Sequence, residues 1–141
     1  MRRMFDRAGW TLDRIALGLV AIFMLPAGLQ AAFAPESFYT DFPFGRGWIA
    51  ASGEAYDEHL VRDVGALFLA LVLATLWSVV KKWPLTGLAA AWLLQGILHF
   101  AYHVGHLDNL DGADKAGMVI TLASVPILAA LALWDSLRRA R

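Results

Sequence analysis

The sequence contains no cysteine, and its 12 basic and 12 acidic residues cancel to a formal net charge of zero. The absence of cysteine excludes disulfide bonds, thiol catalysis and thiolate metal ligands. The absence of a basic excess removes the positive field that attracts nucleic acid, so we expect no nucleic-acid partner. Charged residues make up only 17% of the chain, against about 25% in soluble domains. The chain therefore offers little charged surface to water.

Apolar residues, by contrast, make up 59% of the chain and gather in long blocks. A helix needs about 20 apolar residues to cross a bilayer, and it satisfies its own backbone hydrogen bonds where lipid cannot. Four blocks meet this length, at about residues 15–33, 60–80, 85–104 and 116–134. The sequence therefore predicts an all-α integral membrane protein: a four-helix transmembrane bundle that forms a single domain, residues 1–141, with the lipid bilayer around it.

The first apolar block follows several arginines, which makes a cleaved signal peptide an alternative, with residues 32–34 as an A-x-A cleavage site. The block is too long for such a peptide, and Pro35 would follow the cut, where proline is poorly tolerated. We therefore expect an uncleaved helix.

The longest non-spanning segment lies between the first two helices, at residues 35–57. It is rich in aromatic residues, Phe38 and Trp48 among them, so it is unlike a free linker. We expect this outer loop to lie on the membrane surface or to fold over the bundle as a lid.

Several residues mark the ends and bends of the predicted helices. Asp57 is placed to cap the second helix, Pro84 fits the first turn of the third, and Asp111 suits the start of the fourth. Pro26 and Pro126 fall inside the first and fourth helices and should bend them.

Small residues on the second and third helices, such as Gly65 and Gly96, are typical of close helix packing. Trp92 lies midway along the third helix. We expect it in the core or against lipid rather than as a quinone contact.

Basic residues are distributed unequally between the two ends of the predicted bundle. Nine fall on the side of the termini and the second loop: Arg2, Arg3, Arg7, Arg14, Lys81, Lys82, Arg138, Arg139 and Arg141. Three fall on the other side: Arg46, Arg62 and Lys115. Because basic loops are retained in the cytoplasm, we expect both termini to be cytoplasmic, an N-in/C-in arrangement.

All four histidines fall toward the outer side. His99, His103 and His106 follow an i, i+4, i+7 spacing, which places them on one face of the third helix. Gln95 extends this stripe by one turn toward the middle of the helix.

The second helix carries a polar group of its own near its outer end. His59 and Asp63 are one turn apart, with Arg62 beside Asp63. A short loop joins the second and third helices, so we expect them to be antiparallel neighbours whose outer ends meet at one depth. That packing would bring both polar groups into a single outer-facing pocket.

Imidazoles and carboxylates together suit a transition metal such as Zn, Fe, Cu or Mn. The predicted metal ligands are His59, Asp63, His99, His103 and His106, and the predicted cofactor-binding set is His59, Arg62, Asp63, His99 and His103. Imidazoles from the two helices could instead ligate haem, or His and Asp could relay protons. In the simplest alternative, the histidines are interfacial residues and the group on the second helix only fixes helix packing.

The stretches Ala34–Tyr39, Asp41–Pro43 and Glu58–Ala66 resemble uncharacterised bacterial four-helix membrane proteins, which are in turn similar to the DoxX-like group. That group includes small membrane subunits associated with quinone-linked redox enzymes. The resemblance implies a four-helix fold in the inner (plasma) membrane of a bacterium. This chain departs from the group in lacking cysteine and in carrying the histidine stripe, so a thiosulfate or thiol-related activity does not transfer to it.

These observations predict a small integral membrane protein whose outer-facing His/Asp pocket binds a metal, haem or a small ligand, with a redox or quinone-linked role. The alternative is a non-catalytic accessory or assembly subunit of a larger membrane complex. A small transporter is the third candidate. Since four helices make a thin wall for a conduit, a transporter would have to be a homo-oligomer.

Overall fold

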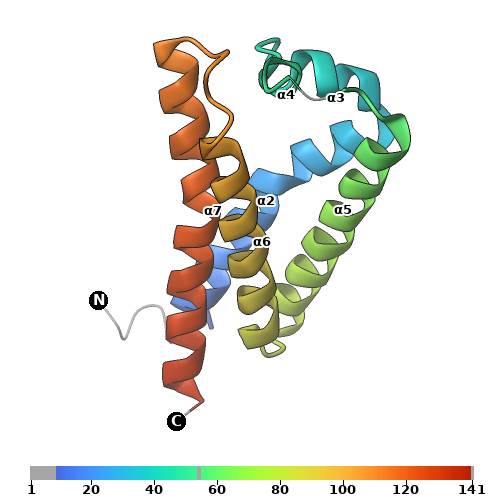
Figure 1. The fold of residues 1–141 in the computed structure, drawn as a ribbon. Helices are drawn as coiled ribbons and strands as arrows, with labels where there is room; N and C mark the ends of the chain where they lie inside the picture. Colours follow the sequence, from blue (N-terminus) through green and yellow to red (C-terminus); the bar gives the residue numbers. More distant parts are fainter. Residues whose placement is uncertain (1–8, 54, 141) are drawn as a thin grey trace.

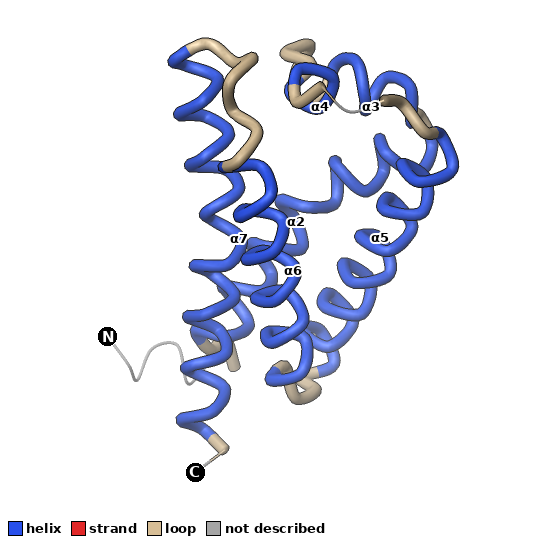
Figure 2. Tube along the Cα trace, viewed as in Figure 1, coloured by secondary structure: helices blue, strands red, loops and turns tan. Residues whose placement is uncertain are grey.

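The computed structural model describes residues 9–53 and 55–140, and every regular element in that part of the chain is a helix. The elements are α2 (Leu12–Phe33), α3 (Pro35–Asp41), α4 (Trp48–Ala51), α5 (Glu58–Lys81), α6 (Thr86–Val104) and α7 (Gly112–Arg139) (Figure 1). The four predicted long helices are confirmed, as α2, α5, α6 and α7, and only short loops separate the elements (Figure 2).

Two of the predicted helix caps are confirmed. The Asp57 carboxylate accepts a hydrogen bond from the Leu60 amide at 3.0 Å, and the Asp111 carboxylate accepts one from the Asp114 amide at 2.8 Å. Each bond satisfies an amide that has no partner within the helix. The placement of Pro84 was wrong by two residues, because α6 begins only at Thr86.

Three of the long helices, rather than the predicted four, are long and apolar enough to cross a membrane among the residues described: α2, α5 and α7. The exception is α6, whose 19 residues include Gln95, His99 and His103. These polar side chains lower its mean hydropathy. The three apolar helices suggest a membrane protein, and α6 is the helix that brings polar groups among them.

The long helices form two arms that meet at one end and diverge at the other: α2 and α5 make up the first arm, and α6 and α7 make up the second (Figure 1). Helix α2 packs against both α5 and α7, and α6 packs along α7. Helices α5 and α6 make few contacts with each other, and they diverge from the loop that joins them like the arms of a V (Figure 1). The core lies where the arms meet and includes Leu17, Val20 and Trp92, all fully buried. The expectation that Trp92 belongs to the core is confirmed.

Glycine allows the closest helix contacts. A Cβ atom at Gly65 would lie 2.4 Å from the Ala32 amide nitrogen of α2 and 2.8 Å from the Ala31 carbonyl carbon. On the other arm, a Cβ atom at Gly96 would lie 2.9 Å from Cδ of Pro126 in α7. The predicted role of both glycines in close packing is confirmed. The partner of α5 at Gly65 is, however, α2 rather than α6.

The outer loop folds over the open end of the V. We call residues 35–53, which contain α3 and α4, the strap. At its beginning Phe38 is buried against Ala27 and Ala31 of α2. At its end Trp48 is buried with Leu110 and Met118, next to α7. The loop therefore packs across the bundle, as in the expected lid, and its placement on a membrane surface stays a prediction.

Most of the described basic residues belong to the helix ends away from the strap, where both described ends of the chain lie (Figure 1). Arg46, Arg62 and Lys115 lie at the strap end. Arg14, at the start of α2, donates hydrogen bonds of 3.1 Å to the Ser78 and Val79 carbonyls near the end of α5. At the same end, the Asp13 amide donates to the Asp135 carboxylate of α7 at 3.1 Å. Four of the basic residues counted above lie outside the described residues: Arg2, Arg3, Arg7 and Arg141.

Candidate functional site

The histidine stripe consists of His99 and His103 of α6 and His106 just after it, and its inner end lies beside apolar side chains of α5. The rings of His99 and His103 lie edge to face with their centroids 4.6 Å apart. His99 also meets the edge of Phe68 on α5 at 6.4 Å between centroids. His99 is thus the one predicted site residue that reaches across to the facing arm.

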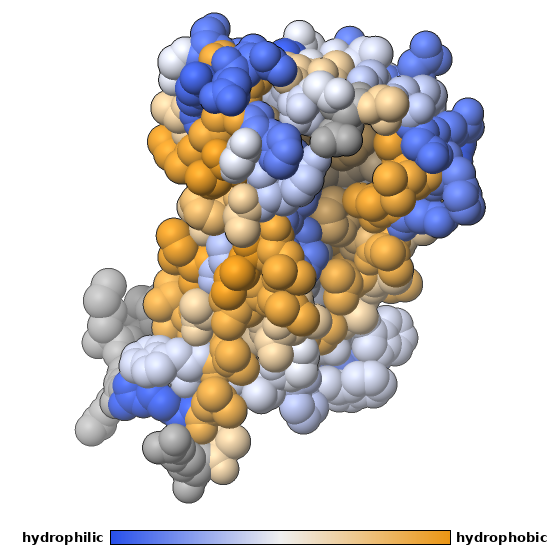
Figure 3. All heavy atoms as spheres, viewed as in Figure 1, coloured by the Kyte–Doolittle hydropathy of each residue, from blue (hydrophilic) through white to orange (hydrophobic). Residues whose placement is uncertain are grey.

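A groove of about 600 Å³ opens between α5 and α6 beside His99. The side chains that line it are Val64, Leu67, Phe68, Ala70 and Leu71 of α5, with Gln95 and His99 of α6. The wall from α5 is therefore wholly apolar, and the wall from α6 supplies an amide and an imidazole. The space-filling view shows a hollow between the two arms, with orange walls and some blue atoms inside it (Figure 3).

His103 and His106 differ from His99 in their surroundings. The Nδ1 atom of His103 is buried and has no hydrogen-bond partner in the described part of the chain. Leaving a buried nitrogen unpaired is costly, so Nδ1 of His103 requires a hydrogen-bond partner that the described residues do not supply. His106 is exposed, stacks on Tyr102 at 4.3 Å and places its Nδ1 atom 2.8 Å from the Tyr102 carbonyl oxygen. The Nδ1 atom of His106 is therefore used locally.

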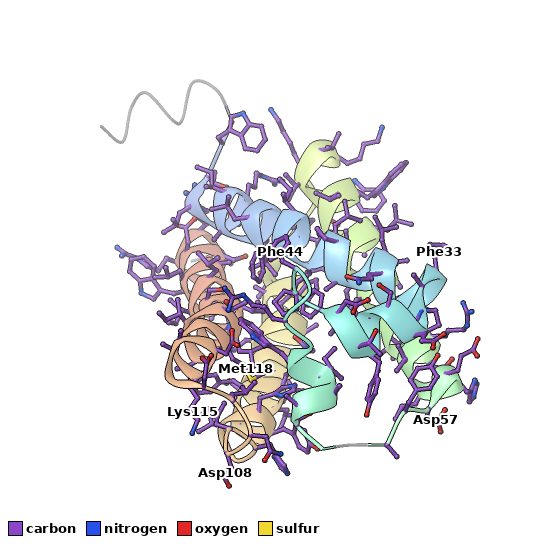
Figure 4. The ribbon with its side chains drawn as sticks, turned by 90° about the horizontal axis from the view of Figure 1, so that it is seen from above. Phe33, Phe44, Asp57, Asp108, Lys115 and Met118 are labelled. Atoms are coloured by element: carbon purple, nitrogen blue, oxygen red, sulfur yellow. The ribbon has the colours of Figure 1, made fainter. Side chains whose placement is uncertain are left out.

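The structure does not bring the polar group of the second helix to the histidine stripe. His59 and Asp63 lie 3.5 Å apart (Nε2 to Oδ2), but their side chains are 88% and 59% exposed. Viewed from above, Asp57 before α5 and Asp108 after α6 lie far from each other, with the strap between them (Figure 4). The shared outer pocket that we expected from neighbouring helices is therefore not formed, because α5 packs on α2 instead of along α6.

Arg62 ties α5 to α2. Its Nε atom donates to the Glu58 carboxylate at 2.8 Å, and its Nη1 atom donates to the Ala32 carbonyl oxygen at 2.6 Å. Ala32 lies in the last turn of α2, where carbonyl groups lack partners within the helix. Arg62 thus pairs with Glu58 and fixes the packing of two helices, which is the role that the simplest alternative gave to this polar group.

Tyr56 lies just before α5, where its ring packs against Tyr39 of the strap at 5.3 Å between centroids. Partial burial, followed by the nearby carboxylates of Glu58 and Glu36, raises the pKa of the Tyr56 phenol above its ordinary value of 10.0. The phenol therefore stays protonated at neutral pH and acts here as a neutral group.

The donor atoms do not converge in the way that a protein metal site requires. Within residues 9–53 and 55–140, no three His, Cys, Asp or Glu side chains come together as a group that could hold a metal ion. His59 and Asp63 on one arm, and His99 and His103 on the other, stay as two separate pairs. The assignment of a metal or haem therefore stays a prediction.

Two features of this site escaped the sequence analysis. The residues of the apolar wall, such as Val64 and Phe68, have the same sequence pattern as any membrane-spanning helix, so the sequence did not mark them as part of a site. The anchor of the strap was also missed: Asp114 of α7 forms an ion pair with Arg46 and accepts a hydrogen bond from Nε1 of Trp48 at 2.9 Å. One indication of this anchor was present in the sequence: Asp114 and Arg46 both fell on the predicted outer side of the membrane.

No protein-family model, no curated protein and no solved structure matches the chain. The DoxX-like resemblance therefore stays a prediction, and the site is interpreted from its own geometry.

Proposed function

We propose that this chain is an integral membrane protein that binds a small, largely apolar ligand in the groove between α5 and α6. The observation that carries the proposal is the groove itself, with its apolar wall from α5 and its two polar groups from α6. Its volume of about 600 Å³ lies in the range of about 300–1,000 Å³ that small-molecule sites occupy. An apolar cavity with a few polar groups is the usual form of such a site.

Gln95 and His99 hold the polar end of the ligand in this proposal. They are one helical turn apart, so their side chains reach toward the same region beside α6. The amide offers donors and an acceptor, and the imidazole offers one of each when neutral. His103 packs against His99 at 4.6 Å and orients its ring. A lipid-soluble redox carrier such as a quinone, with carbonyl acceptors on an apolar body, has this chemistry, so the quinone-linked role belongs to the proposal.

We also propose that the termini face the cytoplasm of a bacterium and that the strap faces outward across the inner membrane. The support is the gathering of basic residues at the end that holds the described termini, as in Arg14, Lys81 and Arg139. Trp77 and Trp134 lie at the same end, beneath Lys81 at 5.1 Å and Arg138 at 4.5 Å. Tryptophan and basic residues together are typical of the cytoplasmic membrane interface.

The test is to identify what the detergent-purified protein carries. Solvent extraction followed by mass spectrometry is expected to find one bound species in the wild type, which His99→Ala reduces strongly. His59→Ala is the matched control, because it removes an imidazole that is 88% exposed and outside the groove. Equal amounts of the species in both variants, or none in the wild type, would contradict the proposal.

The same sample decides whether a cofactor shares the site. An absorbance spectrum with a Soret band, lost in His99→Ala or His103→Ala, would replace the small ligand by haem. Stoichiometric zinc, iron or copper by elemental analysis would replace it by a metal ion.

A non-catalytic accessory subunit is the second candidate, and the shape of the V favours it. Leu67 of the groove wall is 66% exposed, and α6 exposes Leu94 and Leu98 (62% each), apolar surface that a helix of another protein could cover. A partner that co-purifies in fixed ratio and is crosslinked through position 94 or 98 would favour this role over ligand binding.

A further inference from the structure

We infer that the ligand of this groove is an electrically neutral, lipid-borne amphiphile that enters sideways from the bilayer, between α5 and α6. This inference rests on the proposed function and adds the class of ligand and its route. Three observations carry it: the strap is fixed to both arms of the V, Leu67 and Ala70 of the apolar groove wall are exposed, and no charged residue lines the groove.

The strap is fixed to both arms of the V. On the first arm Phe38 is 9% exposed and packs with Ala27 and Ala31 of α2. On the second arm Trp48 is 8% exposed and donates its Nε1 hydrogen to Asp114 of α7. A ligand arriving from water at the outer end would have to displace one of these attachments.

The flank between α5 and α6 has no such barrier. The two helices diverge beyond their joining loop (Figure 1), and Leu67 and Ala70 of the groove wall are both exposed. In a bilayer these side chains face hydrocarbon. An apolar ligand dissolved there reaches the groove without crossing water, and its tail remains among lipid chains when its head is bound.

The side chains that line the groove determine which polar head group of a ligand can bind there. Val64, Leu67, Phe68, Ala70, Leu71, Gln95 and His99 include no charged side chain. An ionised head group would lose its hydration there without gaining an opposite charge, which is strongly unfavourable. Hydroxyl, carbonyl and ester groups, by contrast, exchange hydrogen bonds with an amide and a neutral imidazole at little cost. The groove therefore fits a neutral head on an apolar body.

The experiment compares the protein with a variant whose strap is covalently crosslinked to α7, which we call the tied protein. Because the chain has no native cysteine, Arg46→Cys with Asp114→Cys places two thiols across the anchor, and a flexible bismaleimide then joins the strap to α7 covalently. The protein is reconstituted in phosphatidylcholine vesicles that contain a fatty alcohol with a diazirine in its chain. After brief illumination, labelling of peptides with Val64–Leu71 or Gln95–His99 is measured by mass spectrometry over time.

We expect the tied and untied proteins to be labelled at the same rate and to the same extent. His99→Ala should lower groove labelling about tenfold, which the loss of one hydrogen bond of ordinary net strength accounts for, and His59→Ala should leave it unchanged. A fatty acid of the same length with the same diazirine should label the groove several times less than the alcohol does.

Each of the other outcomes contradicts one part of the inference: the lateral route, the neutral head group or ligand binding itself. Loss of labelling on tying the strap overturns the lateral route and leaves ligand binding intact. Equal or stronger labelling by the fatty acid overturns the neutral head. Absence of groove labelling in every variant, with no extracted ligand from the wild type, overturns the proposed function as well. If the first cysteine pair does not fold, Ser52→Cys with Asn109→Cys ties the strap elsewhere. Ser52 is next to Gly53, where a Cβ atom would lie 3.9 Å from Nδ2 of the Asn109 side chain, and the flexible bismaleimide spans the remaining distance.

Discussion

The indole Nε1 of Trp48 donates a hydrogen bond of 2.9 Å to the Asp114 carboxylate, which lies 66 residues further along the chain. The same carboxylate forms the ion pair with Arg46, so one side chain at the start of α7 holds the end of the strap. Because the beginning of the strap is held by α2, this contact connects the two arms across the open end of the V.

Asp114→Ala is expected to release the end of the strap without unfolding the bundle. It removes one hydrogen bond and one partly exposed ion pair, together worth about 1–2 kcal/mol. The effect is therefore local, and limited proteolysis should cut within residues 42–53 faster than in the wild type. Asp108→Ala is the control, since Asp108 is exposed in the loop before α7. Equal cleavage in the two variants would count against the anchor.

Gly65→Ala is expected to destabilise the contact between α5 and α2. The new methyl group would lie 2.4 Å from the Ala32 amide nitrogen, and backbone cannot yield as a flexible side chain does. We expect a loss of about 1–3 kcal/mol, seen as a lower midpoint of thermal unfolding in detergent. Gly18→Ala in α2 is matched to it, because a Cβ atom there would meet nothing within 4 Å. A drop of similar size at Gly18 would show that the effect is not due to packing.

Thr75→Val tests a buried polar link between α5 and α6. Nε1 of the fully buried Trp92 donates to the Thr75 hydroxyl at 2.9 Å, so valine leaves the indole N–H without its partner. Measured costs for such bonds between membrane helices average about 0.6 kcal/mol and reach about 1.7. Thr75→Ser keeps the hydroxyl and should restore most of the lost stability. A serine variant as unstable as the valine variant would refute the role of the bond.

Arg14→Lys is expected to loosen the end of α5 although the charge is kept. The guanidinium donates to the Ser78 and Val79 carbonyls through one nitrogen, and its Nη2 atom lies 3.3 Å from the Trp83 carbonyl oxygen. A lysine ammonium on a flexible stem does not reproduce this planar geometry. Amide hydrogen exchange should quicken in residues 79–85. Arg138→Lys, an exposed change at the same end of the bundle, should not produce this effect.

The proposed orientation predicts an asymmetric labelling pattern. Ser52→Cys in the strap should react with a membrane-impermeant maleimide on intact cells, whereas Ala140→Cys should react only after the membrane is permeabilised. The native chain contributes no background because it has no cysteine. The reverse pattern would place the strap in the cytoplasm and overturn the orientation.

The candidate site shows where sequence reasoning stopped. The spacing of His99 and His103 correctly placed both on one face of α6, because a helix fixes which side chains share a face. The step to a pocket shared with His59 and Asp63 failed, because it assumed that helices joined by a short loop pack along their whole length. The glycine at position 65 made α2 a closer partner for α5 than α6 is.

The sequence by itself determined the helices, most of their caps and the suggestion of a membrane. These depend on local properties: hydrophobic length, backbone hydrogen bonding, and the preference of residues such as Asp57 and Asp111 for helix starts. Only the tertiary structure decided that the arms diverge, that the strap spans their open end and that His99 faces Phe68. Those features depend on which of several similar apolar surfaces fit most closely, and small differences in shape between helix faces settle that choice.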